Sequence, residues 1–270
     1  MHINRANIAF FVMIALGGVV WAKIAIQLLH DYFNFNRLAT LTHFCPLYLH
    51  GLAGVHDSIS VVFQIIIASC MVFTICRMGF EIRNSYDMDR YVNNSKNKVW
   101  SHYMNARFRI WNIPIYVIEN DEKYTYTYGF LHSKIVISSG LLVQLDEDTL
   151  NAVMLRHYCH CSSRNPLKSL IVWFIKGSLP FIPINHAIFH YLRIWMELRA
   201  DEFVLKIMPN RKTGVKTALF YCDSPVQALP YRVEHLYKSC SVVKVPVWTT
   251  GSVLISIIMT CLLIFSMTSC

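Results

Sequence analysis

The chain has 270 residues, of which 54% are hydrophobic and only 15% are charged, and its formal net charge is +9. Soluble globular domains usually carry about 25% charged residues, so the composition excludes an ordinary soluble domain and predicts an integral membrane protein. The basic residues flank apolar segments and form no basic surface with aromatic stacking residues, so we expect no binding of nucleic acid. The nine cysteines are odd in number and scattered, which argues against a disulfide framework.

The N-terminal part of the chain contains two apolar segments. Residues 8–29 are long enough to cross a bilayer of about 30 Å as a helix. The run is too long for a signal peptide and no cleavage site follows, so it predicts an uncleaved span. A second span is predicted at 59–76. Basic residues are frequent over 77–109, whereas the preceding loop has only Arg37. This bias predicts that the N-terminus and the region after the second span are cytoplasmic.

The middle of the chain has mixed helix and strand patterns. Residues 86–111 have the spacing of an amphipathic helix, and residues 113–118 and 134–138 are rich in β-branched residues, as is typical of strands. Between these strands, Tyr124–Tyr128 alternates tyrosine and threonine, which favours an exposed strand ending at Gly129. The sequence therefore predicts a small antiparallel sheet.

A helix capped by Asp146 is expected next, and Pro166 favours a break after it. The apolar stretch 167–183 spans about 25 Å as a helix, which is marginal for a full crossing, and a second helical stretch returns over 185–206. We expect a hairpin that either dips into the membrane or lies along its surface. Residues 207–245 are mixed and predicted to be cytoplasmic, and 247–267 form a last predicted span.

The order of these segments resembles a known protein family. The resemblance rests on five features: Ile135–Leu142, the helix that holds His160, the apolar hairpin, Glu197-x-x-Ala-Asp201 and Arg232–Leu236. Together they resemble the membrane gluzincin metalloproteases, which include the BlaR/MecR-type sensor-transducer peptidases and the related HtpX-type and CAAX prenyl proteases. The long extracellular sensor of the β-lactam receptors has no counterpart here, so sensing of β-lactams is not expected.

The resemblance implies an α+β membrane protein in which transmembrane helices accompany a cytoplasmic gluzincin-like domain. Residues 1–77 would hold two transmembrane helices, and residues 247–270 would form a C-terminal one. The metalloprotease-like domain would span 78–246, with a membrane-associated hairpin at 167–206. The location is then the cell membrane, with several crossings of the chain.

Active members of this family have the motif H-E-x-x-H, because two histidines one helical turn apart face the same zinc ion and the glutamate takes a proton from its bound water. Here His160 lies five residues before Asn165-Pro166, which places it at the second histidine. Arg156 then replaces the first histidine, and His157 replaces the general-base glutamate. Glu197 matches the third ligand, and Asp201 matches the acid that supports the site.

Arginine stays protonated in proteins and cannot bind zinc. Arg156 could therefore supply the positive charge that the metal would supply, and we predict that it contacts Glu197. An alternative zinc site combines His157 and Cys161, which are also four residues apart, with Glu197 or with His160 as well, but it lacks an adjacent glutamate base. Cys159 and Cys161 are better interpreted as small buried apolar residues than as ligands. The Tyr124–Tyr128 strand suits either a substrate-pairing edge or a structural edge.

Three functions follow from these observations. The first is a regulatory pseudoprotease that binds a peptide, a repressor-like protein or an active protease paralogue. The second is an active zinc endopeptidase with altered ligands, which cleaves a membrane or cytoplasmic regulatory protein in signalling. The third is a transport or assembly factor that reuses the fold. The presence of zinc would separate the first two.

Overall fold

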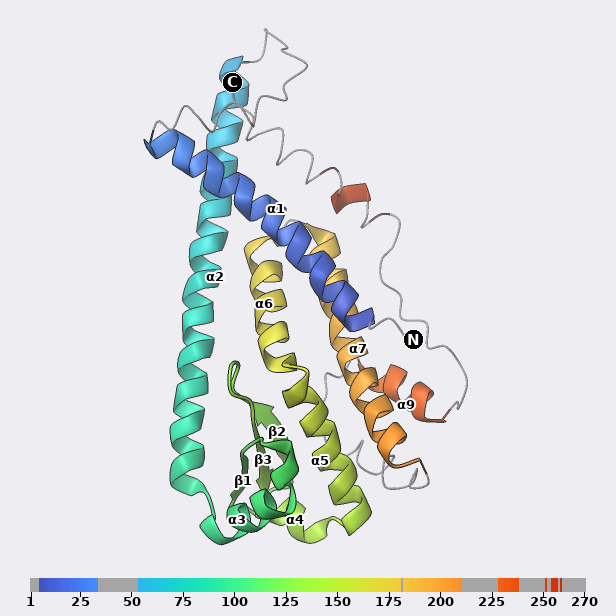
Figure 1. Ribbon diagram of the computed structural model, residues 1–270. Coiled ribbons are helices and arrows are strands. Elements are labelled where there is room, and N and C mark those ends of the chain that lie inside the picture. Colours follow the sequence, from blue (N-terminus) through green and yellow to red (C-terminus); the bar gives the residue numbers. More distant parts are fainter. Residues whose placement is uncertain are drawn as a thin grey trace. The chain divides into compact units, whose positions relative to one another are not determined.

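The computed structural model describes residues 5–33, 53–180, 182–209 and 228–237, together with 251, 254–256 and 258 (Figure 1). The chain divides into two compact units. The first contains Met1–Met78, Val172–Phe189 and Pro246–Cys270, and the second contains Gly79–Ile171 and His190–Val245. Most of the predicted last span at 247–267, and most of the predicted segment 207–245, lie outside the described residues. The predicted domain boundaries at 77 and 246 stay predictions.

Helix α1 (Arg5–Phe33) belongs to the first unit and has two contrasting faces. The buried side chains recur every three or four residues, as one face of a helix requires: Ala6, Ala9, Phe10, Met13 and Val20. The other face is equally apolar but exposed: Ile8, Phe11, Val12, Leu16 and Val19. Among the residues that the structure describes, the stretch Arg5–Ala22 is the one that is long and apolar enough to cross a membrane, with a mean hydropathy of 1.7.

Close packing holds α1 against residues 172–178 within the first unit. Gly17 lies so near this segment that an added Cβ would come within 2.8 Å of a methyl carbon of Ile175. One turn further on, Trp21 stacks on Phe174 with 5.5 Å between the ring centroids. A glycine is therefore needed at residue 17 for this approach, since any larger residue would displace Ile175.

Helix α2 (Ala53–Ser95) is one continuous helix, which corrects the prediction of separate helices at 59–76 and 86–111. No proline interrupts residues 77–95, and Gly79 is tolerated within a helix at a cost of about 1 kcal/mol. The break comes instead at Asn97, whose side chain accepts a hydrogen bond from the backbone N–H of Trp100. Asn97 thereby caps helix α3 (Lys98–Arg107), which a short 3₁₀ turn at Arg109–Trp111 follows.

The sheet has three strands in the order β1-β3-β2: Ile115–Ile118, Lys134–Ser138 and Thr125–Tyr128. Strand β2 pairs antiparallel with β3, but β1 pairs parallel with β3. The sheet is therefore mixed, and the predicted antiparallel sheet is wrong for β1. Strand β3 occupies the centre of the sheet, and its last four residues are all buried. The Thr/Tyr strand β2 takes an edge, as predicted.

The alternation of side chains along β2 and β3 gives the sheet two different faces. Ile135 and Ile137 point to the same face as Thr125 and Thr127, and this face packs against helix α5. The opposite face holds Val136 and a group of tyrosines that pack with Val92 of α2: Tyr116, Tyr124, Tyr126 and Tyr128. The Thr/Tyr alternation thus directs hydroxyl groups toward α5.

Five further helices follow the sheet: α4 (Ser139–Gln144), α5 (Glu147–Ser162), α6 (Asn165–Ser178), α7 (Pro183–Ile207) and α9 (Leu229–Tyr237). The Asp146 side chain accepts a hydrogen bond from the Thr149 N–H, so the predicted cap of α5 is confirmed. Arg164 turns the chain between α5 and α6 with a φ of 52°, and Pro166 lies in the first turn of α6, where its missing N–H costs nothing. The predicted helical arms of the hairpin correspond to α6 and α7.

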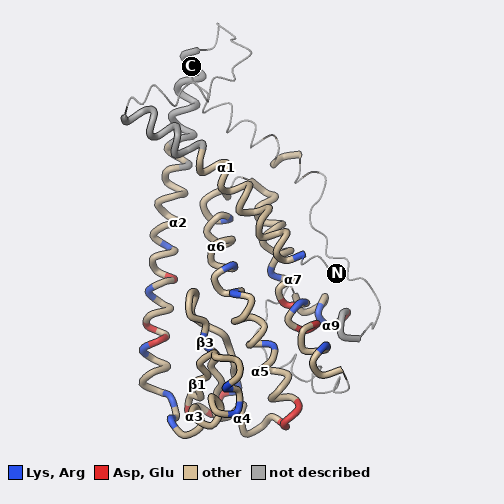
Figure 2. Tube along the Cα trace, in the orientation of Figure 1, with Lys and Arg blue, Asp and Glu red and all other residues tan. Residues whose placement is uncertain are grey.

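Charged residues are unevenly distributed along the helices (Figure 2). Residues 58–76 of α2 contain no Lys, Arg, Asp or Glu, whereas residues 77–90 contain six. In Arg5–Ala22 of α1, Arg5 is the only charged residue. The charged residues of α2 are thus concentrated in the part of the helix that belongs to the second unit.

Candidate functional site

Helix α5 carries the candidate site, and neighbouring residues of this helix point to two different surroundings. Leu150, Met154 and Cys161 are spaced four and seven residues apart and pack with the isoleucines of the sheet. Ala152 and Val153 pack instead with Val204 of α7. Since successive residues of an α-helix are rotated by about 100°, Arg156 continues the α7 face and His157 continues the sheet face.

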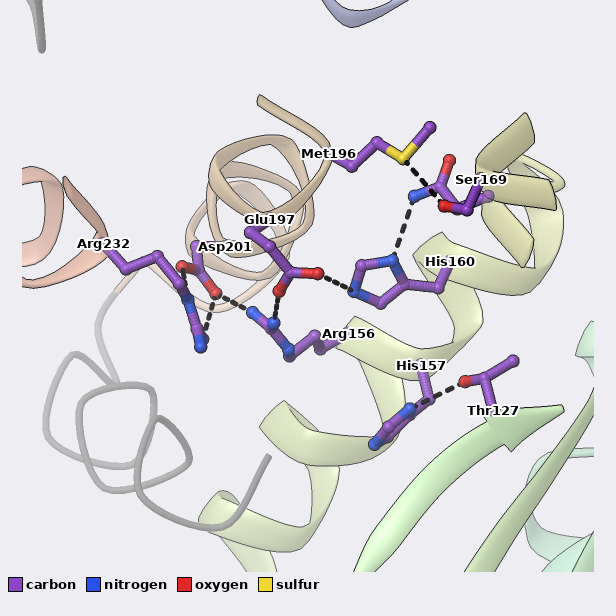
Figure 3. A network of polar contacts seen from close by, with 10 residues as sticks. Thr127, Arg156, His157, His160, Ser169, Met196, Glu197, Asp201 and Arg232 are labelled. Atoms are coloured by element: carbon purple, nitrogen blue, oxygen red, sulfur yellow. Dashed lines mark hydrogen bonds and ion pairs between the residues drawn. The ribbon is translucent and has the colours of Figure 1, made fainter. Parts of the chain in front are cut away.

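Arg156 is the centre of the α7 face. Its side chain is only 3% exposed, and its guanidinium group forms ion pairs with both Glu197 and Asp201, four residues apart on α7 (Figure 3). The predicted contact between Arg156 and Glu197 is therefore confirmed. A buried carboxylate is costly unless a hydrogen-bonded cation faces it, and the planar guanidinium group satisfies two carboxylates at once.

A second buried arginine completes this cluster. Arg232 of α9 donates from Nε to Oδ2 of Asp201 at 2.7 Å and from Nη2 to Oδ1 at 2.9 Å. Arg232 is 1% exposed, so both of its hydrogen bonds lie in the interior. Two buried cations thus face two carboxylates, and Asp201 joins α5, α7 and α9 through a single side chain.

His160 lies beside this cluster, one turn after Arg156. Its Nδ1 is 2.9 Å from Nδ2 of Asn165, and its Nε2 is 3.9 Å from Oε1 of Glu197. Burial, and after it the charge of Arg156, holds the pKa of His160 well below its usual value, so the ring is neutral at neutral pH. The 3.9 Å distance is too long for a hydrogen bond. His160 and Glu197 are therefore neighbours that leave room between them.

His157 points away from this cluster, toward strand β2 (Figure 3). Its Nε2 is 3.1 Å from Oγ1 of Thr125, and its Nδ1 is 2.8 Å from Oγ1 of Thr127. Thr125 donates its own proton to the carbonyl of Val136, so its oxygen accepts from Nε2–H of His157. Nδ1 then carries the lone pair and accepts from Thr127.

This arrangement uses both ring nitrogens of His157 in fixed hydrogen bonds. Burial, reinforced by the neighbouring charge of Arg156, lowers the pKa of His157 to about 3. A general base near neutral pH needs a free lone pair and a pKa close to the working pH. The resemblance predicts His157 at the place of the family's glutamate, but its geometry suits a structural link between α5 and β2.

Cys159 and Cys161 are both buried, at 4% and 7% exposure. Cys161 belongs to the hydrophobic cluster between α5 and the sheet, and burial raises its pKa to about 12. Burial also raises the pKa of Cys159. Zinc binds the thiolate form, which burial disfavours here. The alternative site of His157 and Cys161 lies on the sheet face of α5, whereas Glu197 contacts the other face.

A pocket of about 220 Å³ opens beside these residues, and every residue that lines it belongs to the second unit. Its wall includes Arg156, His160 and Glu197 on one side and Tyr126 and Thr127 of the edge strand on another. The remaining lining residues are His157, Asn165, Pro166, Ser169, Arg193 and Met196. The candidate site is thus accessible to a ligand even though its charged groups are buried.

The donor set does not fit the zinc site of a metalloprotease, which needs three protein ligands and an open fourth position. His160 Nε2 and Glu197 Oε1 are the two donor atoms left facing each other, whereas Asp201 is occupied by two arginines. Among the residues that the structure describes, no three His, Cys, Asp or Glu side chains are placed to hold one metal ion. The Arg156 guanidinium group also carries a positive charge that would repel the ion.

Comparison with models of known protein families gives no match, and no curated protein sequence matches the chain. The resemblance to the membrane gluzincins therefore stays a prediction. The sequence placed Arg156, His160, Glu197 and Asp201 together, and the structure brings them together. It did not identify the roles of Thr125 and Thr127, Arg232 and Asn165. A signal for Arg232 was present, since two buried carboxylates require two cations and Arg156 is only one.

Proposed function

We propose that the protein is a membrane pseudoprotease, which uses a gluzincin-like domain to bind a protein or peptide partner and does not hydrolyse it. The observation that carries this proposal is the pairing of Arg156 with both Glu197 and Asp201. A fixed positive charge stands where the family holds its metal, and it satisfies the carboxylates that would otherwise attract one. In this proposal the side chains keep the arrangement of the family's site, but a guanidinium group takes the place of the metal ion that would act as a Lewis acid.

The environment of His157 supports the same proposal. Hydrolysis by this class of enzyme requires a base that takes a proton from the attacking water. His157 has both nitrogens engaged by threonine hydroxyls, and its pKa is lowered to about 3. The sequence has thus replaced two parts of the catalytic apparatus, and each replacement has its own set of stabilising partners.

Several membrane crossings are part of the proposal. Helix α1 has an exposed apolar face, and α2 also exposes large apolar side chains. Those of α2 lie within its uncharged stretch 58–76: Ile65, Ile66, Val72, Phe73 and Ile75. Exposed apolar surface of this extent is unfavourable in water and favourable against lipid. With the predicted span at 247–267, the basic residues that follow α2's apolar part favour a cytoplasmic location for the protease-like domain.

The partner is proposed to be a peptide segment of a protein, such as a repressor or an active protease paralogue. Strand β2 is an edge strand, and its residues Tyr126 and Thr127 line the pocket. An edge strand can pair with an extended peptide, and a pocket beside it can receive one of the peptide's side chains. Binding of nucleic acid is not part of the proposal, since the basic residues flank the apolar segments.

The proposal is tested by the metal content and peptidase activity of the protein purified in detergent. We expect no stoichiometric zinc and no cleavage of a casein substrate by the wild type. The double variant R156H/H157E restores the family motif and should bind zinc in a one-to-one ratio, because His160 and Glu197 are already in place. Zinc in the wild type that is lost in H160A or E197A would instead establish an active endopeptidase. Failure of the double variant to bind zinc would show that the assigned register is wrong.

A further inference from the structure

The pocket wall contains one hydrogen-bond donor whose proton position the geometry fixes. Nδ2 of Asn165 lies 2.9 Å from Nδ1 of His160, and an amide nitrogen can only donate. Nδ1 therefore carries the lone pair, and the ring proton of the neutral His160 is on Nε2. The negative charge of Glu197, 3.9 Å from Nε2, favours the same tautomer. His160 thus presents an N–H group toward the pocket.

The neighbouring acceptor is Oε1 of Glu197. The other carboxylate oxygen, Oε2, is paired with Arg156, whereas Oε1 has His160 Nε2 as its neighbour at a distance that is too long for a hydrogen bond. Glu197 and His160 both line the pocket and are about one-eighth exposed. One donor and one acceptor thus lie side by side, and neither satisfies the other.

We propose that this pair binds a primary carboxamide, the head group of a glutamine or asparagine side chain of the peptide partner. The carboxamide C=O accepts from Nε2–H of His160, and its NH₂ group donates to Oε1 of Glu197. The inference rests on the proposed binding function and adds the chemical class that the pocket selects.

Other groups fit the pair less well. A trans backbone amide directs its N–H and C=O to opposite sides, so it can reach only one member of the pair. A carboxylate would place a second negative oxygen against Glu197, and an apolar side chain would leave both polar atoms without partners. Met196 and Tyr126 provide apolar surface in the same pocket for the methylene stem of the side chain.

The test uses the full-length protein in lipid nanodiscs and three capped tripeptides: acetyl-Ala-Gln-Ala, acetyl-Ala-Glu-Ala and acetyl-Ala-Met-Ala, each with an N-methylamide end. Their affinities are compared by saturation-transfer NMR. We expect the glutamine peptide to bind at least about tenfold more tightly than the other two, which corresponds to about 1.4 kcal/mol. Equal affinities, tighter binding of the glutamate peptide or no binding of any peptide would refute the inference.

The variant H160F removes the donor and keeps an aromatic ring, and H102F is its matched control because His102 lies exposed on α3. We expect the preference for glutamine to disappear in H160F and to persist in H102F; its persistence in both refutes the inference. If H160F does not fold, the ¹⁵N shifts of the His160 ring in the wild type decide, since the proposal requires the proton on Nε2.

Zinc is measured on the same samples. Metal-free protein without a glutamine preference contradicts only this inference, whereas zinc-loaded protein contradicts the proposed function.

Discussion

The two faces of helix α5 stabilise their buried polar side chains in different ways. On the α7 face, Arg156 is held by charged partners, and on the sheet face, His157 is held by neutral hydroxyl groups. These residues are adjacent in the sequence, and the resemblance predicts that they occupy the two altered positions of the family motif. The comparison teaches that buried polar side chains of different charge need different partners. The carboxylates of α7 are paired with a buried cation, whereas His157 is held neutral by hydroxyl groups.

Removal of the charge on the α7 face should have the largest effect. The substitution R156M removes the arginine that pairs with Glu197 and one of the two arginines that pair with Asp201. Both carboxylates lie in the interior, where they are at most 12% exposed. Breaking a buried ion pair by removing one partner costs about 3–5 kcal/mol. The free energy of unfolding in detergent, measured by denaturant titration, should fall by that amount. The control is R107M, because Arg107 pairs with Glu147 at the surface and its loss should cost about 1 kcal/mol or less. Equal losses in the two variants would contradict this comparison.

Removal of the second buried arginine, Arg232, should lower the free energy of unfolding less than removal of Arg156. The substitution R232M removes two hydrogen bonds to Asp201, but Arg156 still pairs with that carboxylate. Hydrogen bonds to charged groups contribute about 1.5–3 kcal/mol each, so we expect the two lost bonds to lower the free energy of unfolding by about 3 kcal/mol in the same titration. A loss larger than that of R156M would show that Arg232, and not Arg156, is the main counter-charge of the cluster.

On the sheet face of α5 the expected loss of stability is smaller again, because the substitution leaves no unpaired charge in the interior. The substitution T125V leaves the Nε2–H of His157 without its acceptor, at a cost of about 1–2 kcal/mol. The conservative variant T125S keeps the hydroxyl and should lose clearly less. If both variants are equally destabilised in thermal unfolding, the hydroxyl does not hold His157.

The pH dependence of stability should reflect the same neutral imidazole. The folded-state pKa of His157 is lowered to about 3, whereas a histidine in the unfolded chain has a pKa of about 6.5. Between these values the unfolded chain binds more protons, so the stability falls as the pH decreases from 6.5 toward 3, by at most about 1.4 kcal/mol per pH unit for this group. Unfolding titrations from pH 7.5 to 5 should show a shallower slope for H157Q than for the wild type and an unchanged slope for H102Q. A slope that H157Q leaves unaltered would rule out a buried neutral His157.

Much of the fold follows from local patterns in the sequence. The alternation of Tyr124–Tyr128 predicted the edge strand, and Asp146 predicted the start of α5. Both signals act within a few residues and need no knowledge of distant parts. The parallel pairing of β1 was missed because packing in the assembled core decides it. The break between α2 and α3 depends on a single N-cap, Asn97 of α3, in a region where the helical pattern itself continues.

The site was predictable where one side chain required another. A buried arginine opposite a buried glutamate follows from charge and helical spacing, and Arg156 does contact Glu197. The partners of His157 were not predictable in this way, because a histidine can be satisfied by many neutral groups. Which of them is used depends on the register of β2 against β3, where Thr125 lies opposite Ile137. Long-range register is a property of the folded sheet and leaves little trace in the local sequence.

The proposed role of Arg156 as the counter-charge of Glu197 is tested most directly by a double-mutant cycle with R156M, E197Q and the combined variant. Because each single change leaves a buried partner unmatched and the double change removes both, the combined loss of unfolding free energy should be smaller than the sum of the single losses by about 1–3 kcal/mol. Strictly additive losses would mean that Arg156 and Glu197 do not stabilise one another, and the account of this site would then be wrong.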